Sequence, residues 1–450
     1  MSRLPKRKQA TWALTAWSVL MLASGWAHAQ SLTPLQAWEK ARGKDPDYLA
    51  AQSDRDAILE EYTQAKAQMY PVVNASYSNT RNERTMSSDA SVYNYESNNR
   101  SLTVRQPLFR KALLVGLDRA QLRVSGAQAN LKSQSFNLAI RLTGFYMDLV
   151  VAHQALSAAQ SNLLFMQGQL EASQRAYASG VGTVLQVNEA RARTDLADVD
   201  VRTAKVQIEV AREALATVIG ESDPGVMRLD LAVLSSLNWT LPPLKVWTDQ
   251  AMQESPLIQS VAAQVEVASQ DIEKSRAGHY PTVDAVYQVT HSAGESVTSP
   301  TFSYKNNSLG VQLNIPLFSG GYVESTVRQA QAGLEKARFN KQSTERQVIV
   351  QMSKDYKQVN DGLQRIEALS RSYKDLELAE TAARLSLQAG VGTRVQWLEV
   401  QARLAKTLQD LAEAYKPLAV SYVTLHALTG RLDDETMNRV AAPLKPVPAP

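Results

Sequence analysis

The chain has 450 residues, of which 20% are charged and 7% aromatic, and it contains no cysteine. The lack of cysteine excludes disulfides, thiolate metal ligands, a catalytic thiol and an N-terminal lipidated cysteine. The formal net charge of +4 comes entirely from Arg3, Lys6, Arg7 and Lys8. The remaining chain is therefore electrically balanced, and its charge gives no reason to expect a nucleic-acid partner.

The first residues have the features of a secretory signal peptide. The basic residues precede an apolar run over about 12–25, and Ala27-His28-Ala29 then has the small-x-small form of a signal-peptidase site. A transmembrane anchor is the alternative, but the apolar run is shorter than the roughly 20 residues that a spanning helix needs. We therefore expect residues 1–29 to be a signal peptide, and we leave them out of the fold.

The rest of the chain carries one pattern twice, at an offset of 210 residues. The matched motifs are Asp45-Pro46 with Ser255-Pro256, Tyr70-Pro71 with Tyr280-Pro281, Pro107-Leu108-Phe109 with Pro316-Leu317-Phe318 at an offset of 209, and Ile219-Gly220 with Thr429-Gly430. A constant offset predicts one structural unit used twice. We expect the units at 30–220 and 244–430, a connector at 221–243, and a flexible, proline-rich tail at 431–450.

Each unit is predicted to begin with a helix of roughly 35 residues, at 35–69 and 244–279, ended by its Tyr-Pro pair. A β-hairpin follows at about 71–107 and 281–316, because apolar and polar residues alternate there with period two. The Ser- and Asn-rich segments inside these hairpins, at 79–99 and 291–307, are predicted to be long exposed loops.

A long helical hairpin is predicted to complete each unit, at about 112–219 and 320–429. Proline-free stretches of roughly 65 to 70 residues predict helices on the order of 100 Å long, which suit a tubular assembly rather than a globule. Each long helix ends at a Gly-x-Gly-Thr turn, in which glycine can close one helix and threonine can cap the next. Gln186 and Gln396 stand three residues after the threonines, as a capping box requires.

The strand count indicates an oligomer. In a bilayer every strand must be paired within a closed barrel, and single-chain barrels have about eight strands or more, whereas two hairpins supply four. A soluble protein explains the alternation equally well. Export, exposed loops and very long helices favour the membrane. The predicted fold class is an α+β membrane protein with an internal two-fold repeat, in which long antiparallel helical hairpins form a tubular assembly and four strands contribute to a shared transmembrane β-barrel.

The order, spacing and duplication of these motifs resemble the TolC family of outer-membrane channel proteins, across nearly the whole mature chain. The resemblance implies a homotrimer whose β-barrel lies in outer-membrane lipid and continues as a periplasmic α-barrel, a tunnel of the long helical hairpins. It implies partners, namely a periplasmic adaptor (membrane fusion) protein and an inner-membrane ABC or RND-type transporter, and it implies no cofactor and no catalysis. The Asp45-Pro46 pattern and the absence of a lipidated cysteine are more similar to the type I protein secretion branch, with multidrug or small-molecule efflux as the alternative.

The resemblance also implies where the channel narrows. The turn residues Gly180, Val181, Gly182 and Thr183, and Gly390, Val391, Gly392 and Thr393, would form the periplasmic tips where the adaptor docks. The plain alternative is ordinary turn chemistry. In the family, an arginine and acidic residues after the second turn form the closed entrance. The matching positions are Arg394 and Glu399, with Gln396 in place of the other acid, and Gln186 and Glu189 in the first unit.

We expect three copies of Glu399 to crowd at the constriction and to bind cations. The alternative is a carboxylate that is merely solvated on a helix face. Gln396 has an alternative role of its own as the capping partner of Thr393.

Other functional classes fit less well. The sequence has no HExxH motif, no phosphate-binding glycine-rich loop and no nucleophile elbow, which disfavours an enzyme. A periplasmic coiled-coil adaptor or a structural protein would share the long hairpins, but it would not need duplicated strand pairs. Tyr70, Tyr77, Tyr280 and Tyr287 are candidates for an aromatic belt at the membrane surface, or for ordinary strand packing.

Overall fold

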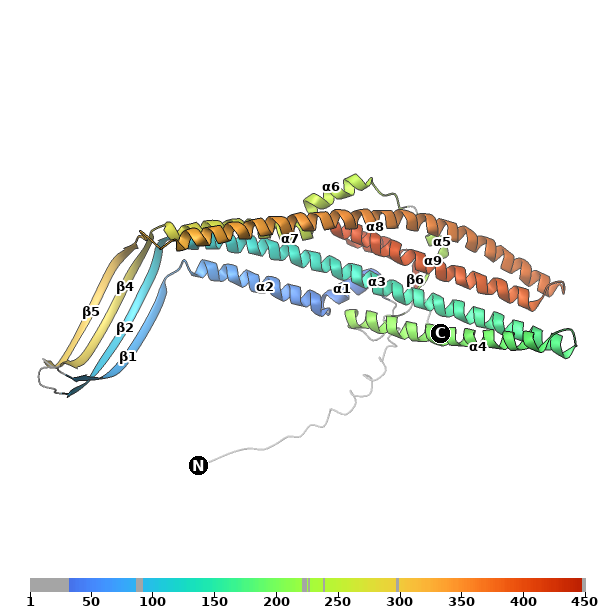
Figure 1. The fold of residues 1–450 in the computed structure, drawn as a ribbon, viewed down its shortest axis with the longest axis horizontal. Helices are drawn as coiled ribbons and strands as arrows, with labels where there is room; N and C mark the ends of the chain where they lie inside the picture. The colour runs from blue at the N-terminus through green and yellow to red at the C-terminus, as the bar shows by residue number, and fades with distance from the viewer. Residues whose placement is uncertain are drawn as a thin grey trace, which may run out of the picture.

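The structure is a computed structural model that describes residues 32–85, 92–220, 225, 227–237, 239–296 and 299–446. The predicted signal peptide lies outside these residues. The described chain is elongated, with a β-sheet at one end and two helical hairpin tips at the other (Figure 1). None of the helices described is both long enough and apolar enough to cross a membrane.

The opening helix of each unit is broken, contrary to the prediction of one continuous helix. The first unit has α1 (Pro34–Arg42) and α2 (Pro46–Ala67), and the second has α6 (Leu244–Glu254) and α7 (Pro256–Arg276), followed by the 3-10 turn η1 (Ala277–His279). The breaks fall at Asp45 and Ser255, whose ψ angles of 120° and 121° are extended. Proline disfavours helical geometry in the preceding residue, yet it fits the first turn of the next helix.

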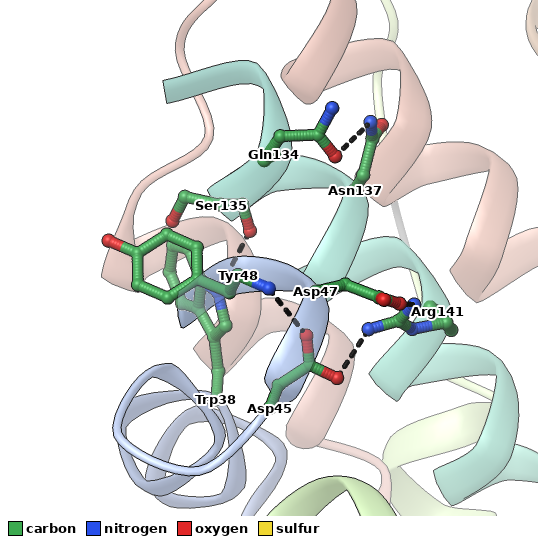
Figure 2. A network of polar contacts seen from close by, with 8 residues as sticks. All are labelled: Trp38, Asp45, Asp47, Tyr48, Gln134, Ser135, Asn137 and Arg141. Carbon is green, nitrogen blue, oxygen red and sulfur yellow. Dashed lines mark hydrogen bonds and ion pairs between the residues drawn. The ribbon is translucent and has the colours of Figure 1, made fainter. Parts of the chain in front are cut away.

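Buried polar contacts fix the first break against the long helix α3 (Lys111–Ala178), as Figure 2 shows. The Asp45 side chain caps α2 by accepting from the Tyr48 backbone N–H at 2.9 Å, and its other oxygen accepts from Arg141 of α3. Trp38 Nε1 donates to the carbonyl of Ser135 at 3.2 Å. The opening segment is therefore docked on α3 by specific contacts at both sides of the break.

The four long strands form one antiparallel sheet in the order β1-β2-β4-β5, namely β1 (Val72–Thr85), β2 (Val92–Arg110), β4 (Thr282–Ser296) and β5 (Ser299–Asn314). In the described part of the chain, β1 and β5 each keep one edge without a strand partner.

The prediction of long loops at 79–99 and 291–307 was wrong for most of both segments. Strand pairing continues to Thr85 with Val92 in the first hairpin and to Ser296 with Ser299 in the second. Polar side chains do not interrupt a ladder that is made by backbone groups. Residues 86–91 and 297–298 lie outside the described chain.

The two helical hairpins were predicted correctly. Helix α3 has 68 residues and pairs with α4 (Val184–Ile219), and α8 (Tyr322–Gln388) has 67 residues and pairs with α9 (Arg394–Leu428). Each long helix is about 100 Å in length. Near the sheet the helices pack in the order α2-α3-α7-α8, and toward the tips in the order α4-α3-α9-α8 (Figure 1).

The two lateral edges of the chain consequently differ. One edge is made of β1, α2 and α4, and the other of β5 and α8. The hydrophobic core lies midway along the body, where α1, α3, α4, α8 and α9 meet, and includes the fully buried Leu142, Leu215, Met352 and Leu418.

The structure differs from the prediction of a flexible tail at 431–450. Helix α10 (Asp434–Ala441) packs on this core through Met437 and Val440, and β6 (Leu444–Pro446) pairs with β3 (Met227–Leu229) next to the short helix α5 (Leu231–Leu234). The Tyr415 hydroxyl donates to the carbonyl of Val440 at 2.7 Å. Residues 447–450 are not described.

Candidate functional site

The tips of the two hairpins have the same backbone. Gly180 and Gly390 have φ angles of 77° and 75°, in the left-handed region that glycine adopts without steric cost. In the first tip the N–H groups of Val181 and Gly182 both donate to the carbonyl of Ala176, at 3.0 and 2.9 Å. In the second tip the N–H groups of Val391 and Gly392 donate in the same way to Ser386, at 3.1 and 3.0 Å.

A capping box begins each returning helix, as the sequence predicts. The Thr183 N–H donates to Gln186 Oε1 at 3.0 Å, and the Gln186 N–H donates to Thr183 Oγ1 at 3.3 Å. Thr393 and Gln396 make the same pair at 3.0 and 3.2 Å. The structure therefore gives both glutamine side chains a capping role.

The most exposed apolar side chains of the tips are the two turn valines. Val181 is 86% exposed and Val391 is 83% exposed. Val184 and Leu185 extend this apolar surface along the first turn of α4, at 58% and 64% exposure. Adjoining exposed apolar side chains are typical of a surface that meets another molecule.

An ion pair joins the two hairpins beside the tips. Arg394 Nη1, at the start of α9, lies 3.7 Å from Glu171 Oε2 on α3. Glu171 also lies 3.7 Å from Arg175 on its own helix. Glu171 was not predictable from the sequence, because the residue belongs to the first unit and carries no motif.

Close helix packing holds the hairpins together one turn farther from the tips. Leu398 of α9 is 5% exposed and sits over Gly168 of α3, where an added Cβ would lie 2.7 Å from Leu398 Cδ1. Within the second hairpin, Trp397 Nε1 donates to Glu380 Oε1 at 2.8 Å. These contacts place Arg394 at the end of the closely packed α3–α9 interface.

The proposed acidic residues are placed differently from one another. Glu399 is half-buried and accepts from Arg403 on the next turn of α9. Both residues line a cavity of about 720 Å³ between α3, α4, α8 and α9, together with Lys406. Glu189 is exposed on α4. A single chain thus does not gather its acidic residues into one cluster, and no group of three or more His, Cys, Asp or Glu side chains in the described ranges is arranged to hold a metal ion.

A family profile described as "Outer membrane efflux protein" matches residues 37–221 and, a second time, residues 247–431. The chain belongs to the outer membrane efflux protein family. The two matches fall on the two halves of the sequence, which confirms the internal repeat. The family match also confirms the resemblance to the TolC family and the outer-membrane location, with a periplasmic helical extension.

Among curated members of this family, the chain is 26% identical to the "Proteases secretion protein PrtF" of Dickeya chrysanthemi, over 94% of this chain and 93% of that protein. It is 25% identical to the "Alkaline protease secretion protein AprF" of Pseudomonas aeruginosa, over 97% of this chain and 91% of that protein. The fold is similar to that of the outer membrane protein VceC from Vibrio cholerae, with a TM-score of 0.67 and 17% identity over 89% of this chain and 97% of that one.

Proposed function

We propose that this outer-membrane channel protein is the exit conduit for a protein that an ATP-driven (ABC) inner-membrane exporter secretes. The observation that carries the proposal is the nearly full-length similarity to two proteins named for protease secretion. Small-molecule efflux with a proton-driven (RND-type) pump is the second candidate, favoured by the description of the family.

The functional unit in this proposal is a homotrimer. The two lateral edges of the chain are unlike each other, so a contact of one edge with the other joins copies head to tail. Such an interface closes into a ring where the rotation between copies divides a full turn. Four strands are too few for a barrel of their own. Three copies around one axis would give one shared barrel in the outer membrane and one tunnel of helices in the periplasm.

The chain organisation that supports this unit is part of the proposal. Residues 1–29 are removed on export, residues 30–220 and 244–430 are the two repeat units, and residues 221–243 connect them. The position of the Asp45 and Ser255 breaks at corresponding places in the two units supports these boundaries.

The hairpin tips form the periplasmic entrance in this proposal. Val181 and Val391 offer apolar surface to the adaptor, and the Arg394–Glu171 pair holds the two hairpins together when the entrance is closed. Arg403 only partly compensates the negative charge of Glu399, because both side chains reach solvent. The copies of Glu399 therefore make the narrowed entrance attractive to cations.

The substitution Ser179→Cys, beside the first tip, tests the identity of the partner directly, because the native chain contains no cysteine that could react in its place. Cross-linking in living cells followed by mass spectrometry should capture an adaptor that belongs to an ATP-driven exporter. Cysteine at the exposed Thr217, at the far end of α4, is the control and should not capture it. Capture of an adaptor of a proton-driven pump would replace secretion by efflux. Capture of the protein's own subunits alone would remove the docking role of the tips.

A further inference from the structure

One face of the four-stranded sheet is apolar in the half that adjoins the helices. Residues that lie directly opposite each other in an antiparallel pair share one face of the sheet. On β4 this face carries Val283, Ala285, Tyr287 and Val289. In a membrane barrel the apolar face meets lipid. Because the helices extend into the periplasm, the end of the sheet that is distant from them lies on the outer side of the membrane (Figure 1).

A row of basic side chains follows directly on this apolar face. Tyr77 of β1 pairs with Arg100 of β2, which pairs with His291 of β4. His291 pairs in turn with Lys305 of β5. Arg100 and Lys305 are charged at neutral pH, and His291 becomes charged when it is protonated. We call Arg100, His291 and Lys305 the cationic row; all three side chains are exposed.

The cationic row has no acidic partner in the protein. Among the described residues, none of its three members takes part in an ion pair. The guanidinium of Arg100 instead lies over the ring of Tyr77, 5.6 Å from the ring centroid. An aromatic face stabilises a cation without using its hydrogen-bond donors. The donors of all three side chains therefore remain available to a ligand outside the protein.

The opposite face of the sheet is uncharged at the same height. The neighbouring residues of the four strands there are Ser76, Ser101, Thr290 and Asn306. Membrane barrels carry polar residues toward the lumen, and charges on the lipid face are unfavourable inside the bilayer. A row of cations confined to the lipid face therefore indicates a position at the membrane surface, where a negative charge in the lipid can compensate it.

The length of the apolar face agrees with this position. Eight residues separate Val283, near the helices, from His291, which is about 27 Å along the strand. A tilt of roughly 35–45° reduces this to about 20 Å of height, close to the apolar band of about 25 Å in membrane barrels. The next pairs outward are Asn79 with Asn98 and Ala293 with Ser303. The apolar face thus ends at the cationic row, at the level of the outer headgroups.

We propose that the cationic row binds the phosphate groups of lipopolysaccharide, the phosphorylated glycolipid of the outer leaflet. Neighbouring strands lie about 4.8 Å apart, so the side chains from β2, β4 and β5 can converge on one headgroup. The planar guanidinium of Arg100 matches a phosphate with two parallel hydrogen bonds, and the ammonium of Lys305 adds a point charge. Such a site depends on the outer-membrane location alone, whichever transporter the channel serves.

A comparison of lipids tests this site on the native protein. The purified full-length protein in mild detergent is mixed with lipid A that carries both phosphates, with lipid A that lacks them, or with phosphatidylglycerol, and bound lipid is measured by native mass spectrometry. We expect roughly ten-fold stronger binding of the phosphorylated lipid A than of either other lipid, because charge-assisted hydrogen bonds to phosphate are lost or fewer there. Equal binding of both forms of lipid A would overturn the proposal. Equal binding of phosphatidylglycerol would replace the glycolipid by ordinary phospholipid headgroups.

Substitutions then locate the binding in the cationic row. Arg100→Gln combined with Lys305→Gln should weaken binding of phosphorylated lipid A roughly ten-fold. Arg100→Lys combined with Lys305→Arg keeps both charges and should retain most of the binding. Arg371→Gln combined with Lys374→Gln removes the same charges from exposed positions of α8 and is the control. Undiminished binding by the first variant, or an equal loss in the control, would contradict the proposal.

Discussion

Arg394 and Glu171 form the one ion pair that, in the described chain, joins the two hairpins beside their tips, with 3.7 Å between the guanidinium and the carboxylate. Both side chains are more than half exposed, at 62% and 52%. Exposed pairs of this kind contribute about 0–1 kcal/mol. A contact this weak can hold two hairpins together and still be opened by a docking partner.

Loss of either partner should loosen the entrance. We expect Arg394→Ala and Glu171→Gln each to raise the sensitivity of cells to bulky antibiotics, and the double variant to add little, because both changes remove the same pair. Arg371→Ala removes an exposed pair with Glu367 within α8 and is the control. Unchanged sensitivity in the Arg394 variant, or an equal change in the control, would exclude this pair from the gate.

The balance between Glu399 and Arg403 should set cation binding at the entrance. Glu399→Gln should weaken block by divalent cations in bilayer recordings, because it removes the carboxylate. Arg403→Ala should strengthen the block, because Arg403 donates to that carboxylate. Block that is the same in both variants and the native protein would identify Glu399 as a merely solvated helix residue.

The left-handed glycine at the second tip should matter for the turn itself. An alanine Cβ at Gly390 would meet no described atom within 4 Å, so the cost of Gly390→Ala lies in the backbone. That cost is about 1–2 kcal/mol. Protease cleavage at the tip of the purified protein should accelerate roughly five-fold or more. Gly390→Asn should have a smaller effect, and equal cleavage of all three proteins would contradict a strained turn.

Asp355 should make stability depend on pH. The side chain, 4% exposed, accepts from Ser421 at 2.9 Å and from Gln351 at 2.8 Å, and burial raises its pKa above the ordinary aspartate value. A raised pKa favours the protonated form in the folded state. The associated stabilisation is complete below the unfolded pKa of about 4 and is lost as the pH rises through the folded pKa.

Asp355→Asn should therefore raise the melting temperature at pH 7, where the native carboxylate is charged, and should change it little at about pH 4. Thermal unfolding of the purified protein at both pH values measures the difference. A lower melting temperature at pH 7 would mean that the two accepted hydrogen bonds outweigh the cost of burying the charge.

Local signals in the sequence were sufficient for much of the fold. The Gly-Val-Gly-Thr turns, the capping glutamines and the two long proline-free helices depend on neighbours within a few residues, and all were predicted correctly. The duplicated landmarks then showed that one unit is used twice. The helix break at Asp45-Pro46 was not predicted, although the proline marks its place, and its geometry depends on Arg141, which lies far along the chain.

Contacts between distant segments were not predictable in this way. Glu171 becomes relevant only because α3 and α9 pack side by side, with Leu398 seated on Gly168. The strands extend beyond their apolar residues because the backbone ladder continues through polar ones. The tail folds because Met437 and Val440 pack into a hydrophobic core that is formed by distant helices.

In the proposed architecture several chains form one channel, since each chain contributes only four strands to a single shared barrel. Purified native trimer in a planar bilayer measures this most directly, by the number of conductance steps that one inserted particle produces. The proposed architecture predicts a single step for each trimer, which closes as a unit. Three equal and independent steps, or no conductance from a trimer that is correctly inserted, would contradict it.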